Sequence, residues 1–194
     1  AKQKRILYHR TDPGSFCMFV PDAGGVRLYD AVYSTMKTYH LYDSDAYRIY
    51  FELKESFWSD GSRVSADDFV FAWKRILGHD FESPYASMLY CIENAAAVKA
   101  GDMTSDDLGL SALDWNLLEI TIDPECTTLT NGEKNGEFDP NLFAEIVASP
   151  AFYPLKEDVV TRNAETWDTV ATDMRTNGPF KVSTTSIKGF TLVK

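Results

Sequence analysis

The sequence predicts an α+β fold in which helices pack against a mixed sheet. Apolar residues alternate with polar ones over residues 46–54, which is typical of a strand that buries one face. Residues 65–78 instead place apolar side chains at helical spacing between two capping residues. Strands and helices do not alternate regularly along the chain, so a doubly wound parallel sheet is not expected.

The composition is that of a globular protein without a basic surface. The 194 residues are 44% hydrophobic and 25% charged, enough for one large domain with a core. The net charge is -10, and no basic run exceeds Lys2–Arg5. Nucleic acid and anionic membrane surfaces are therefore not expected as partners. No apolar stretch approaches the roughly 20 residues of a spanning helix. No secretory signal is recognised at the start, and because a mature exported protein lacks one as well, this does not place the protein in the cytoplasm.

The N-terminal part gives the weaker signals. Residues 5–10 are expected to form a short strand, followed by a turn at residues 11–14. Residues 26–36 are expected to form a short helix, because apolar residues recur at every fourth position.

The strand at residues 46–54 and the turn after it are better defined. One side of the strand is expected to be buried, and it is formed by Tyr47, Ile49, Phe51 and Leu53. A tight turn at residues 59–62 places Gly61 where a positive φ is tolerated.

The clearest helix begins after Ser65. Ser65 is a favourable N-cap, Asp68 completes a capping box, and Gly78 marks the end. A second helical stretch opens at Ser83–Pro84, with a break expected near residues 92–94 and closure at Gly101. The remaining expected elements are a strand at 117–122, an irregular loop at 123–141, a short helix at 142–147, a weak helix at 156–167 and a hairpin of strands 180–184 and 190–193.

Cysteine and histidine usage gives no site. The three cysteines are Cys17, Cys91 and Cys126. One disulfide among them is possible, but their spacing does not select a pair. We expect all three to be reduced, with Cys91 buried on a helix. The histidines are scattered without metal-binding spacing, so neither a metal nor a cofactor is expected.

Particular strings resemble one family. W-S-D-G at 58–61 and V-S-A-D-D-F-V-F-A-W-K-R at 64–75 resemble the W-S-D-G-x-x-V-x-A-x-D-F-V-x-x-W-x-R pattern of the family 5 extracellular solute-binding proteins. These are the oligopeptide- and dipeptide-binding components of ABC importers. Further similar strings follow in the family's order: S-P-Y-A-S at 83–87, L-G-L-S-A-L-D at 108–114, F-Y-P-L at 152–155 and T-N-G-P-F-K at 176–181. The resemblance is weaker over residues 1–45 and departs at 123–141.

The resemblance implies part of a two-lobed clamp with a type II periplasmic-binding-protein fold. It assigns residues 1–45 to the main lobe, 46–176 to an accessory α+β domain and 177–194 to a hairpin re-entering the main lobe, without the second lobe. It also implies an extracytoplasmic protein, in the periplasm or at the cell surface, with a lipid anchor left open. The expected partners are a peptide, held largely through its main chain, and an ABC permease, and the protein itself is expected to be a monomer.

The same resemblance implies that Tyr85, Ala86 and Asn177 border the peptide cleft. The Trp58 turn is better explained by turn chemistry than by a site, and adjacent carboxylates at Asp67–Asp68 point apart on a helix. No nucleophile–base motif is present, so an enzyme is not expected. Two alternatives stay open: an interaction or sensory module on the same fold, and, with less support, a hydrolase.

Overall fold

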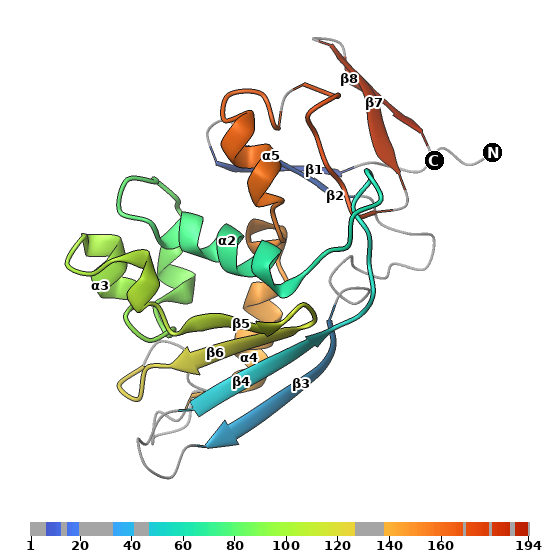
Figure 1. The fold of residues 1–194 in the computed structure, drawn as a ribbon. Coiled ribbons are helices and arrows are strands. Elements are labelled where there is room, and N and C mark those ends of the chain that lie inside the picture. Colours follow the sequence, from blue (N-terminus) through green and yellow to red (C-terminus); the bar gives the residue numbers. More distant parts are fainter. Residues whose placement is uncertain are drawn as a thin grey trace.

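A computed structural model describes residues 7–12, 15–19, 33–40, 47–126, 138–168, 170–178, 180–186 and 189–193. Within them, helices pack beside a four-stranded sheet and two separate hairpins, which confirms the α+β class (Figure 1). The hairpins pair β1 (Leu7–Asp12) with β2 (Ser15–Phe19) and β7 (Lys181–Ser186) with β8 (Gly189–Val193).

The four-stranded sheet has the order β3-β4-β6-β5, and each neighbouring pair is antiparallel. Its strands are β3 (Tyr33–His40), β4 (Tyr47–Leu53), β5 (Leu110–Asp114) and β6 (Leu117–Ile122). β3 comes from the segment assigned to the main lobe yet pairs with β4 along its whole length. The division of the chain at residue 45 therefore stays a prediction.

The predicted burial of one face of β4 is confirmed where side chains are described. Ile49, Phe51 and Leu53 expose 0%, 3% and 4% of their surface, whereas the side chain of Tyr47 lies outside the described part. Alternate residues of β6 are buried on the same pattern. Because side chains alternate between the two faces of a strand, the two central strands present one apolar face.

The helix α2 (Ala66–Leu77) lies over this sheet (Figure 1). It begins as predicted, with Ser65 as N-cap and Asp68 completing the capping box. Its apolar side chains Phe69, Trp73 and Leu77 are buried. It ends at Gly78, which has a negative φ of -58°, so glycine is not required there for a left-handed cap.

The stretch after α2 is less regular than expected. The 3₁₀ helix η1 (Ala86–Leu89) takes the place of the first part of the predicted second helix, and α3 (Ala95–Ala100) forms the last part. The break predicted near residues 92–94 is confirmed, because Asn94 is left-handed with φ 62°. Gly101 caps α3 with φ 87°, a conformation that glycine adopts without strain. A second 3₁₀ turn, η2 (Ser105–Asp107), leads to β5.

The core joins α2 to the C-terminal helices. These are α4 (Pro140–Val147), the 3₁₀ helix η3 (Pro150–Phe152) and α5 (Glu157–Arg162). The Trp73 ring makes edge contacts with Phe143 and Phe152, at centroid distances of 6.5 and 6.4 Å. The indole nitrogen of Trp73 also donates to the carbonyl of Phe152 at 2.8 Å. Segments about 70–80 positions apart in sequence thus meet at one side chain.

One predicted helix is wrong in its described part. The helix expected over residues 26–36 fails at residues 33–36, which lie in β3; residues 26–32 are outside the described part. Positions four apart also lie on the same face of a strand, because side chains alternate with a period of two, so this recurrence fits β3 as well, which pairs with β4. The strand β5 is not among the predicted elements, and its pairing with β6 rather than a strong local pattern holds it in place.

The cysteine prediction is wrong for two of the three residues. Cys91 and Cys126 form a disulfide with a Cα–Cα distance of 5.1 Å, and Cys91 lies in a turn rather than on a helix. The backbone brings them together: Ile92 bridges Ile122 of β6, and the amide of Asp123 donates to the carbonyl of Cys91 at 2.8 Å. A sequence separation of 35 carries no information about this long-range pairing.

Candidate functional site

The first pair of sequence-predicted ligand residues lies at the start of η1. Tyr85 is the N-cap of this turn, is half-buried and packs against the core. Its amide donates to the hydroxyl of Ser83 at 3.2 Å. Ala86 exposes only 3% of its surface and belongs to the core. Of the two side chains, Tyr85 is therefore the one with surface left for a ligand.

The third predicted residue, Asn177, lies in a different place. The carbonyl of its neighbour Thr176 accepts from the amide of Ser59 at 2.7 Å, which sets this segment beside the turn that precedes α2. η1 instead follows the C-terminal end of α2, so the two segments lie toward opposite ends of that helix (Figure 1). The structure does not bring Asn177 and Tyr85 into one cluster. The Asn177 Nδ2 atom is buried and has no hydrogen-bond partner among the described residues.

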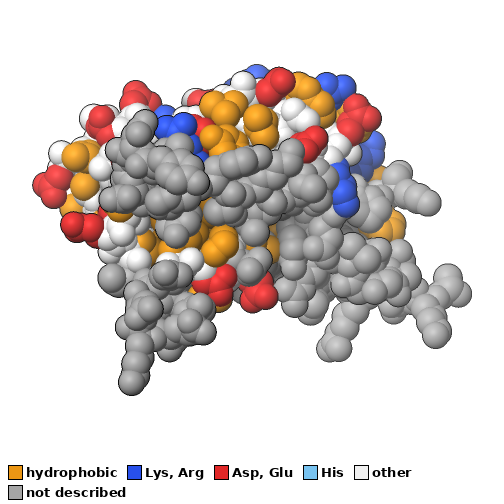
Figure 2. All heavy atoms as spheres, turned by 90° about the horizontal axis from the view of Figure 1, so that it is seen from below, with side chains coloured by type: hydrophobic (Ala, Val, Ile, Leu, Met, Phe, Trp, Pro, Cys, Tyr) orange, Lys and Arg blue, Asp and Glu red, His pale blue; other side chains and the backbone are white. Residues whose placement is uncertain are grey.

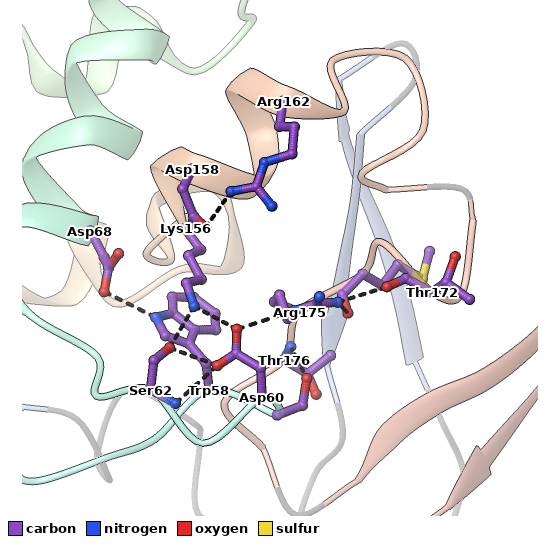
Figure 3. Close-up of polar contacts among 12 residues, drawn as sticks. Trp58, Asp60, Ser62, Asp68, Lys156, Asp158, Arg162, Thr172, Arg175 and Thr176 are labelled. Carbon is purple, nitrogen blue, oxygen red and sulfur yellow. Dashed lines mark hydrogen bonds and ion pairs between the residues drawn. The ribbon is translucent and has the colours of Figure 1, made fainter.

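Asp60 is the centre of a polar cluster that sequence reasoning did not identify (Figure 3). Its Oδ2 accepts from Lys156 Nζ at 2.5 Å and from Arg175 Nε at 3.2 Å. Its Oδ1 accepts from the amide and the hydroxyl of Ser62, at 2.9 and 2.6 Å. One carboxylate thus joins the turn after Trp58, the residue that caps α5 and the segment before Asn177. The only sequence signal was Asp60 itself, which reads as a turn residue.

The electrostatics of Asp60 follow from these contacts. Partial burial raises the pKa of the Asp60 carboxyl, but the hydrogen bonds from Lys156 and Ser62 outweigh burial and hold the pKa well below its ordinary value. Asp60 is therefore ionised throughout the physiological pH range. Its side chain and those of Lys156 and Arg175 are 29%, 18% and 29% exposed, so solvent screens their attraction only in part.

The Trp58 turn itself is structural, as predicted. Gly61 has φ 88° and its amide donates to the carbonyl of Trp58 at 2.8 Å. The buried Trp58 ring donates its indole N–H to Asp68 Oδ2 at 3.0 Å, and the same oxygen accepts the amide of Ser65 at 2.9 Å. Burial raises the pKa of Asp68, and these two hydrogen bonds oppose the rise. Asp68 thus ties the turn to the start of α2, and its contacts account for it without an acid–base role.

A shallow hollow borders the Asp60 cluster. Its accessible volume of about 20 Å³ accommodates roughly one water molecule and not a peptide side chain. It is lined by Trp58, Pro154, Leu155, Lys156, Val159, Val160, Trp167 and Arg175. This hollow is therefore not a candidate peptide site.

The described residues offer little other chemistry. No group of three or more His, Cys, Asp or Glu side chains among them is arranged to hold a metal ion. None of their helices combines the length and the apolar character needed to cross a bilayer. On the face shown in Figure 2, acidic, basic and apolar side chains are interspersed, and its described part carries no continuous basic patch.

Comparisons with known proteins identify the family. The model of the bacterial extracellular solute-binding proteins, family 5, matches residues 39–194. The oligopeptide-binding protein OppA of Bacillus subtilis is 32% identical over 127 residues, which are 65% of this chain and 21% of that protein. The periplasmic oligopeptide-binding protein OppA of Salmonella typhimurium is 31% identical over 135 residues, 68% of this chain and 22% of that protein. This chain thus spans about a fifth of the length of these relatives.

Solved structures agree in fold. Listeria monocytogenes OppA bound to peptide matches with a TM-score of 0.61 and 26% identity, over 85% of this chain and 29% of that one. The Escherichia coli murein tripeptide binding protein MppA matches with a TM-score of 0.66 and 26% identity, over 84% and 28% of the two chains. The predicted type II periplasmic-binding-protein fold is therefore confirmed, in part of its length. This chain belongs to the family 5 bacterial extracellular solute-binding proteins.

Proposed function

We propose that this chain is part of a protein that captures extracytoplasmic oligopeptides and delivers them to an ABC permease. The observation that carries the proposal is the likeness, over 85% of the chain, to an oligopeptide-binding protein with peptide bound. Curated relatives named for oligopeptide or dipeptide binding support it. On this proposal the protein acts by binding rather than catalysis, as a monomer in the periplasm or at the cell surface, where a lipid anchor is an open alternative.

Tyr85 and Asn177 are proposed to border the peptide at two separate points. Tyr85 keeps a half-buried side chain at the N-cap of η1, and the buried Ala86 packs that turn onto the core. Asn177 has a partly buried side chain whose Nδ2 atom is buried and has no hydrogen-bond partner among the described residues, so a peptide carbonyl that reaches it would satisfy this donor. An extended peptide offers backbone carbonyl and amide groups at regular spacing, so widely separated polar contacts suit it. Water fills the space around its side chains, which accounts for low sequence selectivity.

A second candidate ligand is a small amphipathic solute. A relative that is 30% identical over 112 residues is named as a probable deoxycholate-binding periplasmic protein of Escherichia coli. Membership of the family is therefore compatible with a ligand that is not a peptide. The first candidate predicts peptide binding and the second predicts deoxycholate binding, so one experiment tests both.

The test uses the whole protein encoded by the gene, unfolded and refolded to remove bound ligand. Calorimetry with a pool of tri- to pentapeptides is expected to give a micromolar or tighter dissociation constant. Deoxycholate binding without peptide binding would favour the second candidate, and binding of neither would refute both. Mass spectrometry of the peptides after prolonged incubation is expected to show them intact; cleavage would restore the hydrolase alternative.

Variants test the two proposed contacts. Tyr85→Ala and Asn177→Ala are each expected to weaken peptide binding by about ten-fold, or 1.4 kcal/mol, as for loss of one well-placed contact. Ser87→Ala is the matched control, because Ser87 is an exposed residue of the same turn η1. Affinity unchanged by both test variants would remove these residues from the cleft while leaving the function intact.

A further inference from the structure

The segment between α5 and β7 has little regular structure to fix its course. Residues 163–168 and 170–173 form turns and a bend, residues 174–177 have no regular structure, and β7 begins at Lys181. Arg175 stiffens the segment locally, since its Nη1 donates to the carbonyls of Thr172 and Met174 at 2.8 and 3.0 Å. Thr176 closes the bend with a hydrogen bond from its hydroxyl to the carbonyl of Phe180 at 2.8 Å. These contacts shape the segment, but they do not attach it to the rest of the molecule.

The C-terminal part of the segment is attached to the Trp58 turn. The amide of Ser59 donates to the carbonyl of Thr176 at 2.7 Å, and the ion pair of Asp60 with Arg175 lies directly beside it. Figure 3 shows Lys156 and Arg175 both reaching Asp60. Lys156 and Arg175 thus come from two separate segments, and both form ion pairs with the Asp60 carboxylate.

We propose that Asp60 is a positioning residue for the segment 172–178, and through it for the side chain of Asn177. The part of this proposal that concerns ligand binding rests on the proposed function. Ser62 orients the carboxylate by holding Oδ1, which leaves Oδ2 to receive both cations. Asn177 follows the attached residue Thr176 directly, so displacement of the segment displaces its amide.

The arrangement requires a charge and not only a hydrogen-bond acceptor. An asparagine at position 60 keeps an oxygen for Ser62, so the turn can still form. It removes the negative charge that pairs with both Lys156 and Arg175, which leaves Lys156 the attraction of the Asp68 carboxylate and takes from Arg175 its ion pair with Asp60. The conformation in which the segment is released from the Trp58 turn then becomes more favourable, because Arg175 is hydrated again when it moves into solvent.

Hydrogen–deuterium exchange of the whole protein tests the attachment without any ligand. Asp60→Asn is expected to raise amide exchange in residues 172–178 by about ten-fold while leaving β4 and α2 unchanged. Asp158→Asn is the matched control, because Asp158 is a carboxylate 51% exposed whose ion pair within the described part of the chain is the local one with Arg162 on α5. Equal exchange in wild type and Asp60→Asn would overturn the proposal. Should Asp60→Asn fail to fold, Arg175→Gln removes one of the two ion pairs and is expected to act in the same direction.

Peptide binding then tests the positioning role. Asp60→Asn is expected to weaken peptide affinity several-fold through faster dissociation, and Asp158→Asn to leave it unchanged. Faster exchange with unchanged affinity would overturn the positioning of a ligand-binding group. If the wild-type protein binds no peptide, the proposed function fails, whereas the exchange measurement still decides whether Asp60 holds the segment.

Discussion

Replacing Trp73 with alanine is expected to destabilise the protein severely without acting through a binding site. Trp73 is completely buried, and three kinds of interaction end on it: packing within the core, edge contacts with Phe143 and Phe152, and a hydrogen bond to the Phe152 carbonyl. The side chain therefore connects α2 to both α4 and η3. Its removal leaves a cavity where these elements meet.

The magnitude follows from the same contacts. Truncation of a large buried aromatic to alanine costs about 3–5 kcal/mol, from lost transfer energy and from the cavity. The Phe152 carbonyl also loses its donor, an effect of about 1–3 kcal/mol, and Trp73→Phe, which removes the donor and only part of the ring volume, is expected to cost less than Trp73→Ala. For a chain of this size, a loss of 3–5 kcal/mol lowers the melting temperature by roughly 6–20 °C.

Urea unfolding of wild type and variants, with a check that the slope is unchanged, measures the effect. Trp115→Ala is the control of the same residue type: its side chain is 36% exposed and its ring contacts Arg63 at 4.4 Å, so about 1 kcal/mol or less is expected. Equal stability of Trp73→Ala and wild type would refute the central position of this side chain. A loss no larger than that of Trp115→Ala would do the same.

Three further predictions follow from the structure. Replacing Cys91 and Cys126 together with serine should cost about 3–4 kcal/mol by the loop-entropy model for their separation of 35, measured by urea unfolding; alkylation of three thiols in the non-reduced protein would contradict the disulfide. Lys99→Met should cost about 1–3 kcal/mol, because the Lys99 ammonium donates to the carbonyls of Ile76 in the last turn of α2 and of Gly78 and Phe81 just after it, and a thermal melt unchanged within error would exclude this role. The 194-residue chain alone should bind the peptide pool weakly or not at all, since a half-formed cleft leaves the peptide hydrated; micromolar binding in calorimetry would show a self-contained site.

Local chemistry made β4, the Trp58 turn and α2 predictable. The buried face of β4 follows from the two-residue period of a strand, and the capping box of α2 depends on two residues that are three positions apart. Gly61 could be placed for the same reason, because its positive φ is a property of the turn itself. Each of these features is decided within a few neighbouring residues.

Features that depend on distant residues were not predictable in this way. The Cys91–Cys126 disulfide depends on the return of β6 to the turn after η1, and β3 depends on pairing with β4. The Asp60 cluster joins residues separated by 96 and 115 positions, and neither partner carries a motif of its own. The ligand residues Tyr85 and Asn177 came from family resemblance and stay predictions, because single residues in turns have no spacing from which a ligand contact could be inferred.

The pairing of β3 with β4 limits how this protein can be divided for study. A fragment that begins at residue 46 leaves the backbone N–H and C=O groups along one side of β4 without their partner strand, from the position opposite Tyr33 to the position opposite His40. β4 also carries the apolar side chains of Ile49, Phe51 and Leu53. An uncovered strand of this kind recruits a second copy by intermolecular strand addition. Light scattering is expected to show concentration-dependent self-association of fragment 46–176, and a single mass for a fragment that begins at or before residue 33.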